Sequence, residues 1–184
     1  NSMYRIAKNI ANNTLYIATA SVHDLYQSTR LADAQLDAAG NTGSVKYSTN
    51  NGASWQILHD FSDIVAWVAT NPNNANQLYA SVVNSANGNG GVWVSNNTNL
   101  GSASTWTKLP NPPRTEGHPF NIVVLTDGKV VASYSGHRDP SFTASSGVFL
   151  YDPATNTWAD RSAAGMYYWT KDVIIDPNDA TQNT

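Results

Sequence analysis

Short apolar stretches alternate with polar, turn-forming clusters along the whole of this 184-residue chain. Runs rich in Val, Ile, Tyr and Trp, such as residues 64–70 and 147–151, are separated by clusters of Gly, Asn, Asp and Pro. Such runs are typical of β-strands, because β-branched and aromatic side chains fit a pleated sheet and the residues between them form turns. Residues 29–39, where Leu31 and Leu36 could share one face, have the one apolar spacing compatible with a helix. The pattern predicts an all-β protein.

A tryptophan recurs along the chain with a period of about 52 residues. Trp106 lies 51 residues after Trp55, Trp158 lies 52 residues after Trp106, and each follows a small hydroxyl residue. Residues 71–75 have a second copy at 176–180, two periods further on. A repeat of this length with four short strands predicts the blade of a β-propeller.

The repeats divide the chain into four-stranded antiparallel blades. We expect blade 1 at about 3–60, blade 2 at about 63–109, blade 3 at about 119–161 and the start of blade 4 at about 170–184. The expected strands are, in chain order, 3–9, 14–20, 43–48, 54–59, 64–70, 77–83, 91–95, 105–109, 120–126, 129–135, 147–151, 157–161 and 170–176. Propellers close with typically about four to eight blades. We therefore expect a partial propeller, completed by remaining blades or a second propeller of the same protein.

The turn before the first tryptophan resembles the Asp-box hairpin, Ser-x-Asp-x-Gly-x-Thr-Trp. The matching residues are Ser48, Asn50, Gly52, Ser54 and Trp55, with Asn50 in place of the Asp. An Asn side chain can fold back onto turn amides, Gly adopts the left-handed conformation, and Trp offers a large surface for packing between blades. We interpret the motif as structural.

Two further hairpins resemble the same box. Residues 95–106 look like a copy opened by an insertion, and residues 151–158 look like a divergent copy. We therefore expect Trp106 and Trp158 to be structural as well.

Composition excludes several classes of protein. Charged residues make up 12% of the chain, and a formal charge of −3 with a pI near 5.7 leaves no basic surface for nucleic acid. No apolar run approaches the ~20 residues that span a bilayer. Without cysteine there is no disulfide or thiolate zinc site, and the pairs His23–Asp24 and His59–Asp60 lack the further ligands that a metal needs. We expect no metal and no cofactor.

The order of features over about half the chain resembles the family-74 glycoside hydrolases and related secreted bacterial propeller proteins. The residues that carry this resemblance are 91–95, 105–110, 117–119, 127–135, 146–151, 156–161 and 173–177. It implies an extracellular, xyloglucan-cleaving enzyme of two seven-bladed propellers, with one catalytic aspartate in each. Neither aspartate's motif has a match here, so the catalytic residues are unknown. Sialidases also carry Asp boxes, but their arginine triad and Glu-activated Tyr have no match among five scattered Arg and the single Glu116.

The long connections of a blade gather on one face, opposite the short turns. Residues 21–42, 84–90, 110–119, 136–145 and 162–169 fall on that face, where binding residues usually lie. The candidate ligand-binding residues there are His118, Arg114, His137, Arg138, Asp139, Tyr167, Tyr168 and Trp169.

Each candidate has a structural alternative. Tyr167, Tyr168 and Trp169 could form a sugar-stacking platform or fill the space between blades. Residues 137–139 could bind a ligand or form a surface ion pair, and His118 could be a hydrogen-bonded structural group. The sequence leaves two functions open: a secreted propeller that hydrolyses or binds a β-glucan such as xyloglucan or a cell-surface glycan, and a non-catalytic adhesion or protein-interaction propeller.

Overall fold

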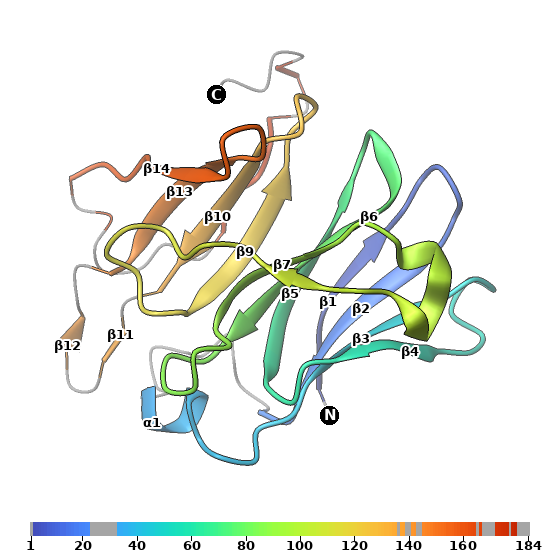
Figure 1. Ribbon diagram of the computed structural model, residues 1–184, viewed down its shortest axis with the longest axis horizontal. Helices are drawn as coiled ribbons and strands as arrows, with labels where there is room; N and C mark the ends of the chain where they lie inside the picture. Colours follow the sequence, from blue (N-terminus) through green and yellow to red (C-terminus); the bar gives the residue numbers. More distant parts are fainter. Residues whose placement is uncertain are drawn as a thin grey trace.

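The computed structural model describes residues 2–22, 33–135, 137–138, 141–142, 145–164, 166, 172–176 and 178–179. Within them the chain forms three four-stranded antiparallel sheets that stand side by side, and one small two-stranded sheet (Figure 1). Each large sheet is a meander whose neighbouring strands follow one another in chain order. The chain is therefore an all-β protein and forms part of a β-propeller, which confirms the predicted fold class.

The bounds of the elements follow the three sheets. The first sheet contains β1 (Ser2–Lys8), β2 (Leu15–Ala20), β3 (Ser44–Ser48) and β4 (Gln56–Asp60). The second contains β5 (Ile64–Asn71), β6 (Asn74–Val83), β7 (Gly91–Ser95) and β8 (Thr107–Lys108). The third contains β9 (Pro119–Val124), β10 (Val130–Tyr134), β13 (Gly147–Asp152) and β14 (Thr157–Asp160). The remaining elements are the helix α1 (Asp33–Leu36), the 3-10 helix η2 (Thr98–Ala103) and the hairpin of β11 (His137–Arg138) and β12 (Ser141–Phe142).

The second sheet is buried on both faces because its side chains alternate between two neighbouring sheets. Val68 packs into the core shared with the first sheet, and Ala69 packs into the core shared with the third. The row through Val68 continues across the sheet as Ala80, Trp93 and Lys108, and the row through Ala69 continues as Tyr79, Val94 and Thr107. This explains why β5 reads as a continuous apolar run rather than as an alternating one.

Two large apolar cores join the three sheets, and a third, smaller cluster includes Ile64, Ala66 and Val83. The core between the first and second sheets includes Tyr16, Val45, Leu58, Phe61 and Leu78. The core between the second and third includes Trp67, Tyr79, Ile122, Tyr134 and Phe149. Burying one such side chain stabilises the fold by about 1.5–3 kcal/mol. The cores therefore hold the sheets face to face.

The three tryptophans that revealed the repeat stand at one register position. Trp158 pairs with Tyr151. Tyr47 pairs with Gln56 and Val94 with Thr107. Trp55 and Trp106 each lie one residue before these strands begin, so they continue the same register. Trp106 packs against the core of the first and second sheets, and Trp158 packs against that of the second and third. All three side chains are half-buried.

Two hairpins of the first and second sheets make the same four hydrogen bonds. In the first, Ser48 Oγ donates to Asn50 Oδ1 (2.8 Å), and Asn50 Oδ1 accepts from Ser54 N (3.0 Å). Asn50 N donates to Ser48 Oγ (3.4 Å), and Asn50 Nδ2 to Ser54 Oγ (2.8 Å). In the second hairpin Ser95, Asn97 and Thr105 repeat these four bonds across the insertion that contains η2.

The structure departs from the sequence interpretation in two places. The strand expected at 170–176 is absent from its described part, because residues 172–176 form no strand. The hairpin of β11 and β12 was not predicted, because its two-residue strands are too short to leave a pattern. The helix expected within 29–39 is observed as the single turn of α1.

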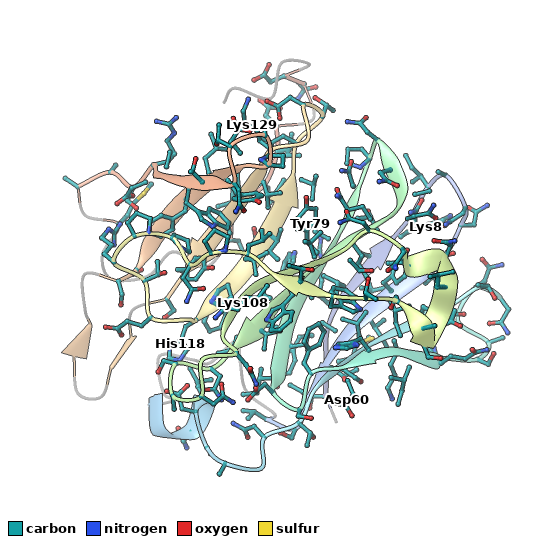
Figure 2. The ribbon with its side chains drawn as sticks, viewed as in Figure 1. Lys8, Asp60, Tyr79, Lys108, His118 and Lys129 are labelled. Atoms are coloured by element: carbon teal, nitrogen blue, oxygen red, sulfur yellow. The ribbon has the colours of Figure 1, made fainter. Side chains whose placement is uncertain are left out.

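The connections lie on two opposite edges of the sheets (Figure 1). We call one the turn edge: it holds residues 9–14, 49–55, 71–74, 96–106, 125–129 and 153–156. We call the other the loop edge: it holds the described parts of residues 21–43, 61–63, 84–90, 110–118, 135–146 and 161–166. Figure 2 shows Lys129 at the turn edge and His118 at the loop edge. In the described part of the chain, no helix has the length and apolar character needed to cross a membrane.

Candidate functional site

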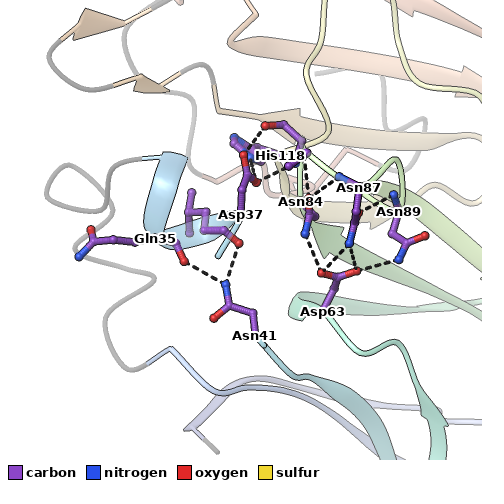
Figure 3. A network of polar contacts seen from close by, with 11 residues as sticks. Gln35, Asp37, Asn41, Asp63, Asn84, Asn87, Asn89 and His118 are labelled. Carbon is purple, nitrogen blue, oxygen red and sulfur yellow. Dashed lines mark hydrogen bonds and ion pairs between the residues drawn. The ribbon is translucent and has the colours of Figure 1, made fainter. Parts of the chain in front are cut away.

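The candidate site is a network of polar side chains on the loop edge (Figure 3). At its centre, His118 Nε2 donates to Asp37 Oδ1 at 3.0 Å. The Asp37 carboxylate also accepts a hydrogen bond from Ser85 N (2.7 Å) and one from Ser85 Oγ. These residues come from three different connections, so the network ties the loop of the first sheet to a loop of the second and to the segment that leads into β9.

His118 and Asp37 differ in their access to solvent. The His118 side chain is 1% exposed and that of Asp37 is 13% exposed. Burial by itself raises the pKa of Asp37, but hydrogen bonds from His118 and Ser85 outweigh it and hold the pKa below its usual value. The pair is therefore built to keep a carboxylate charged and fixed in place.

A buried carboxylate, that of Asp63, lies beside this pair and is held by side-chain amides. It accepts hydrogen bonds from Nδ2 of Asn84 (2.7 Å), Asn87 (3.0 Å) and Asn89 (2.9 Å). Buried charges are tolerated when such donors replace water. Because all three asparagines belong to one short loop, Asp63 fixes the conformation of that loop.

Backbone contacts join the same segments and explain two of the glycines. Asn84 N donates to Gly117 O at 3.1 Å. A Cβ added to Gly90 would lie 1.7 Å from Asn84 O and 2.3 Å from Gly117 O, and Gly117 itself has a φ of +89°. Only glycine fits this close approach. The loop of residues 84–90 is thus pressed against the segment before β9.

Arg114 occupies a separate anchor on the same edge. Its guanidinium donates to Asp160 Oδ2 (2.8 Å), Ser146 O (2.7 Å) and Ser162 Oγ (2.8 Å), and it lies over the Phe149 ring. The hydrogen bond and charge of Arg114 keep the pKa of Asp160 far below its usual range. Arg114 therefore fastens residues 110–119 to the third sheet.

The carboxylates on the loop edge hold neighbouring segments in place and are not placed for acid–base chemistry. A general acid or base must reach the proton that it transfers, and His118 and Asp63 are both closed off from solvent. The carboxylates of Asp37, Asp63 and Asp160 are each held by protein donors. In the described part of the chain, no three His, Cys, Asp or Glu residues converge to hold a metal ion.

The predicted binding residues fall partly outside the described structure. His118 and Arg114 lie on the loop edge. The His118 side chain is only 1% exposed, and Arg114 is bonded to Asp160, so the surroundings of both residues are those of structural groups. His137 and Arg138 form β11, and their side chains lie outside the description. Asp139, Tyr167, Tyr168 and Trp169 also lie outside the described residues. Their roles stay predictions.

Sequence interpretation missed most of the network. Asp37 lies within the long connection 21–42 but belongs to no motif, and the other residues of the network, Asp63, Asn84, Ser85, Asn87 and Asn89, belong to no motif either. The one available signal was the Asn-rich composition of residues 84–89, which marks a loop whose side chains can bond to a neighbouring acid.

Comparison with known proteins places the fold among propellers. The structure is similar to the GH74 xyloglucanase from Xanthomonas campestris, with a TM-score of 0.57 and 16% sequence identity over 85% of this chain and 22% of that one. It is also similar to the GH74 enzyme of Niastella koreensis, with a TM-score of 0.54 and 17% identity over 89% of this chain and 30% of that one. The chain thus spans less than a third of either structure. No protein-family model and no curated protein sequence matches it.

Proposed function

We propose that this chain is part of a larger, extracellular β-propeller whose loop edge binds a polysaccharide of the β-glucan type. The observation that carries the proposal is the network of Asp37, His118 and Ser85. It turns long connections from successive sheets into one fixed surface. Rigid scaffolds that present long loops on one edge commonly bind ligands there.

The similarity to the two GH74 structures supports a carbohydrate ligand. One of them is described as a xyloglucanase. The likeness concerns the fold, and at 16% and 17% identity it leaves the ligand to be tested. We also assign the paired hairpins around Asn50 and Asn97 to the Asp-box class, because both use the same Ser–Asn–hydroxyl bonding pattern.

Binding fits the described residues better than hydrolysis by them. Inverting hydrolysis needs two accessible carboxyl groups roughly 6.5–9.5 Å apart across the scissile bond. The loop-edge carboxylates of Asp37, Asp63 and Asp160 are committed to hydrogen bonds within the protein. If the complete protein cleaves its ligand, we propose that the acids come from outside this chain.

The test uses the full-length protein and a panel of plant and microbial polysaccharides, with calorimetric binding and reducing-end release as separate readouts. Trp169→Ala and Tyr167→Ala remove rings that we propose stack on sugar. Each is expected to weaken binding by about 1–3 kcal/mol, taking base–aromatic stacking as the guide. Arg138→Ala should also weaken it.

The matched control is Asn76→Ala, an exposed residue near the start of β6 at the turn edge. It should leave affinity unchanged, and no variant should lower the melting temperature. Binding without release supports a binding module. Release abolished by one Asp outside this chain supports a hydrolase. Capture of a protein partner without binding to any glycan would reject the carbohydrate function.

A further inference from the structure

A hollow lies away from the loop edge, beside the edge strands β1, β5 and β9 of the three sheets. It is an open groove of about 610 Å³ between β1, β5, β9 and residues 172–175. Its polar lining residues are Arg5, Asn121 and Asp172, and Trp67, Val123 and Val173 belong to its apolar wall. The groove therefore combines a cation, an amide and an apolar surface.

Arg5 is held in place without using its hydrogen-bond donors. Its guanidinium carbon lies 4.1 Å from the centroid of the Trp67 ring. Trp67 is fixed in turn, because its Nε1 donates to Ile122 O at 3.0 Å. Within the described part of the chain, no hydrogen bond or ion pair engages the Arg5 guanidinium. Stacking on an aromatic ring leaves the guanidinium N–H groups free to form paired bonds with a carboxylate.

Asn121 supplies a buried acceptor that lacks a donor. The residue is 2% exposed, and its Oδ1 accepts no hydrogen bond from any described residue. Its backbone N donates to Ser133 Oγ at 3.1 Å, so the unpaired buried atom is the side-chain oxygen. A buried acceptor without a partner is costly, so a donor that entered the groove and reached this oxygen would be stabilised.

Positive charge predominates around the groove. Lys8 lines an adjoining hollow of about 260 Å³ that shares Arg5 and Trp67 with it. Asp172 is the one carboxylate among the lining residues of either hollow. Two cations against one anion favour a ligand with a negative group.

We propose that this groove binds a hydroxylated carboxylate of the uronic-acid type. The ligand carboxylate pairs with the Arg5 guanidinium, a ring hydroxyl donates to Asn121 Oδ1, and the apolar face of the sugar ring lies against the wall that includes Val123. A simple inorganic anion would leave the Asn121 acceptor and the apolar wall unused. This site is separate from the loop edge, so the proposal can be tested independently of the function proposed above.

The experiment compares two sugars that differ at one carbon. Glucuronic acid carries a carboxylate where glucose carries a hydroxymethyl group, and both are titrated into the full-length protein by calorimetry. Glucuronic acid should bind and glucose should bind at least about tenfold more weakly, because a charge-assisted bond is lost.

Arg5→Gln should reduce glucuronic acid affinity by about tenfold or more on the same ground. Arg5→Lys, which keeps the charge but not the paired donors, should fall between. Lys46→Gln is the matched control, because Lys46 is a cation on β3 of the first sheet that lines neither hollow.

A variant of Asn121 separates binding from folding. Asn121→Val removes the orphan acceptor while keeping a residue suited to a strand. The melting temperature should stay the same or rise, while glucuronic acid affinity should fall severalfold. A purely structural Asn would show the opposite, with stability lost and affinity kept.

Any one of several results would overturn the proposal. They are no binding of glucuronic acid to the wild-type protein, equal binding of glucose and glucuronic acid, and equal affinity in wild type and both Arg5 variants. Binding of inorganic phosphate as tight as that of glucuronic acid would also contradict it, because phosphate lacks the sugar ring.

Discussion

His118 Nε2 and Asp37 Oδ1 lie 3.0 Å apart although 81 positions separate them in the sequence. The contact joins the loop of the first sheet to the segment that enters the third, and Ser85 of the second sheet bonds to the same carboxylate. This pair therefore links connections from all three sheets. The geometry of the loop edge depends on this pair.

The first prediction concerns pH. Burial tends to raise the pKa of Asp37, but the hydrogen bonds from His118 and Ser85 lower it overall. A carboxyl whose pKa is lowered by folding stabilises the protein fully above its unfolded pKa, about 3.9 for Asp, and this stabilisation is lost as the pH falls through the folded pKa. Asp37→Asn should therefore cost about 1–3 kcal/mol at neutral pH, as expected for charged hydrogen bonds.

Urea unfolding at a series of pH values measures this effect. The difference in unfolding free energy between wild type and Asp37→Asn should be constant near neutrality and shrink below about pH 4. Asp152→Asn, at the turn edge, is the matched control and should show no comparable gap. A gap for Asp37→Asn that persists unchanged to the most acidic pH would refute the role of the charged pair.

The three repeat tryptophans should differ in their contribution to stability. Trp106 packs on Phe61, with ring centroids 5.2 Å apart, and Trp158 packs on Tyr151 at 5.1 Å. Trp55, at the same register position, faces the outer side of the first sheet and belongs to neither core. Replacing Trp106 or Trp158 by Ala should cost about 3 kcal/mol, the lower end for buried aromatics because both are half-buried.

The same substitution at Trp55 should cost about 1 kcal/mol in this chain, because Trp55 packs against neither core. Chemical denaturation of the three single variants gives the comparison. Equal losses of unfolding free energy in all three variants would contradict the idea that packing against a neighbouring sheet decides how much each tryptophan stabilises the chain.

Two serines at one register position provide a further test. Ser81 pairs with Val92, the second residue of β7, and Ser133 pairs with Val148, the second residue of β13. Both serines are fully buried. Ser133 Oγ accepts a hydrogen bond from Asn121 N, whereas Ser81 Oγ has no partner among the described residues. Ser133→Ala should cost about 1–3 kcal/mol because it leaves a buried N–H unpaired, and Ser81→Ala should be neutral or stabilising. Thermal unfolding compares them, and a larger loss at Ser81 would contradict the assignment of these bonds.

The outer face of the first sheet should drive association. Ile6, Ile17 and Ile57 form a cross-strand row with Lys46, and Ile6 and Ile57 are 48% and 51% exposed. The equivalent row of the second sheet is buried against its neighbour. Exposed apolar patches of this kind commonly mark interfaces. We expect the 184-residue chain produced alone to self-associate at micromolar concentration.

Sedimentation velocity measures this association. The double substitution of Ile6 and Ile57 by Thr should shift the chain toward monomer, while Ile10→Thr, at an exposed site on the turn edge, should not. A wild-type chain that sediments as a stable monomer would contradict the idea that further blades cover this face.

The repeating part of the fold could be predicted from sequence because each blade has the same local rules. The strand expected at residues 91–95 is observed as β7 with the same bounds, since Gly91 and the turn after Ser95 mark both ends. The prediction of a strand failed where its formation depends on a pairing partner. Residues 172–176 have a strand-like composition but form no strand, because a strand also needs a partner to pair with.

The candidate site was predictable only in its location. The lengths of the connections placed it on the loop edge, and His118 was among the expected residues. Its partner Asp37 carries no local motif, and the bond forms only because the packing of three sheets brings the two segments together. The role of Asp63 was equally hidden, since its three Asn donors look like an ordinary polar loop in the sequence.

Hydrogen–deuterium exchange of the full-length protein, with and without xyloglucan, tests the central claim most directly, because it reports which edge of the propeller the polysaccharide covers. We predict that the ligand slows exchange in the loop-edge segments 33–42, 84–90 and 110–118, and leaves the turn-edge segments 71–76 and 125–129 unchanged. Protection confined to the turn edge, or tight binding without protection at any of these loop-edge segments, would contradict a polysaccharide-binding loop edge.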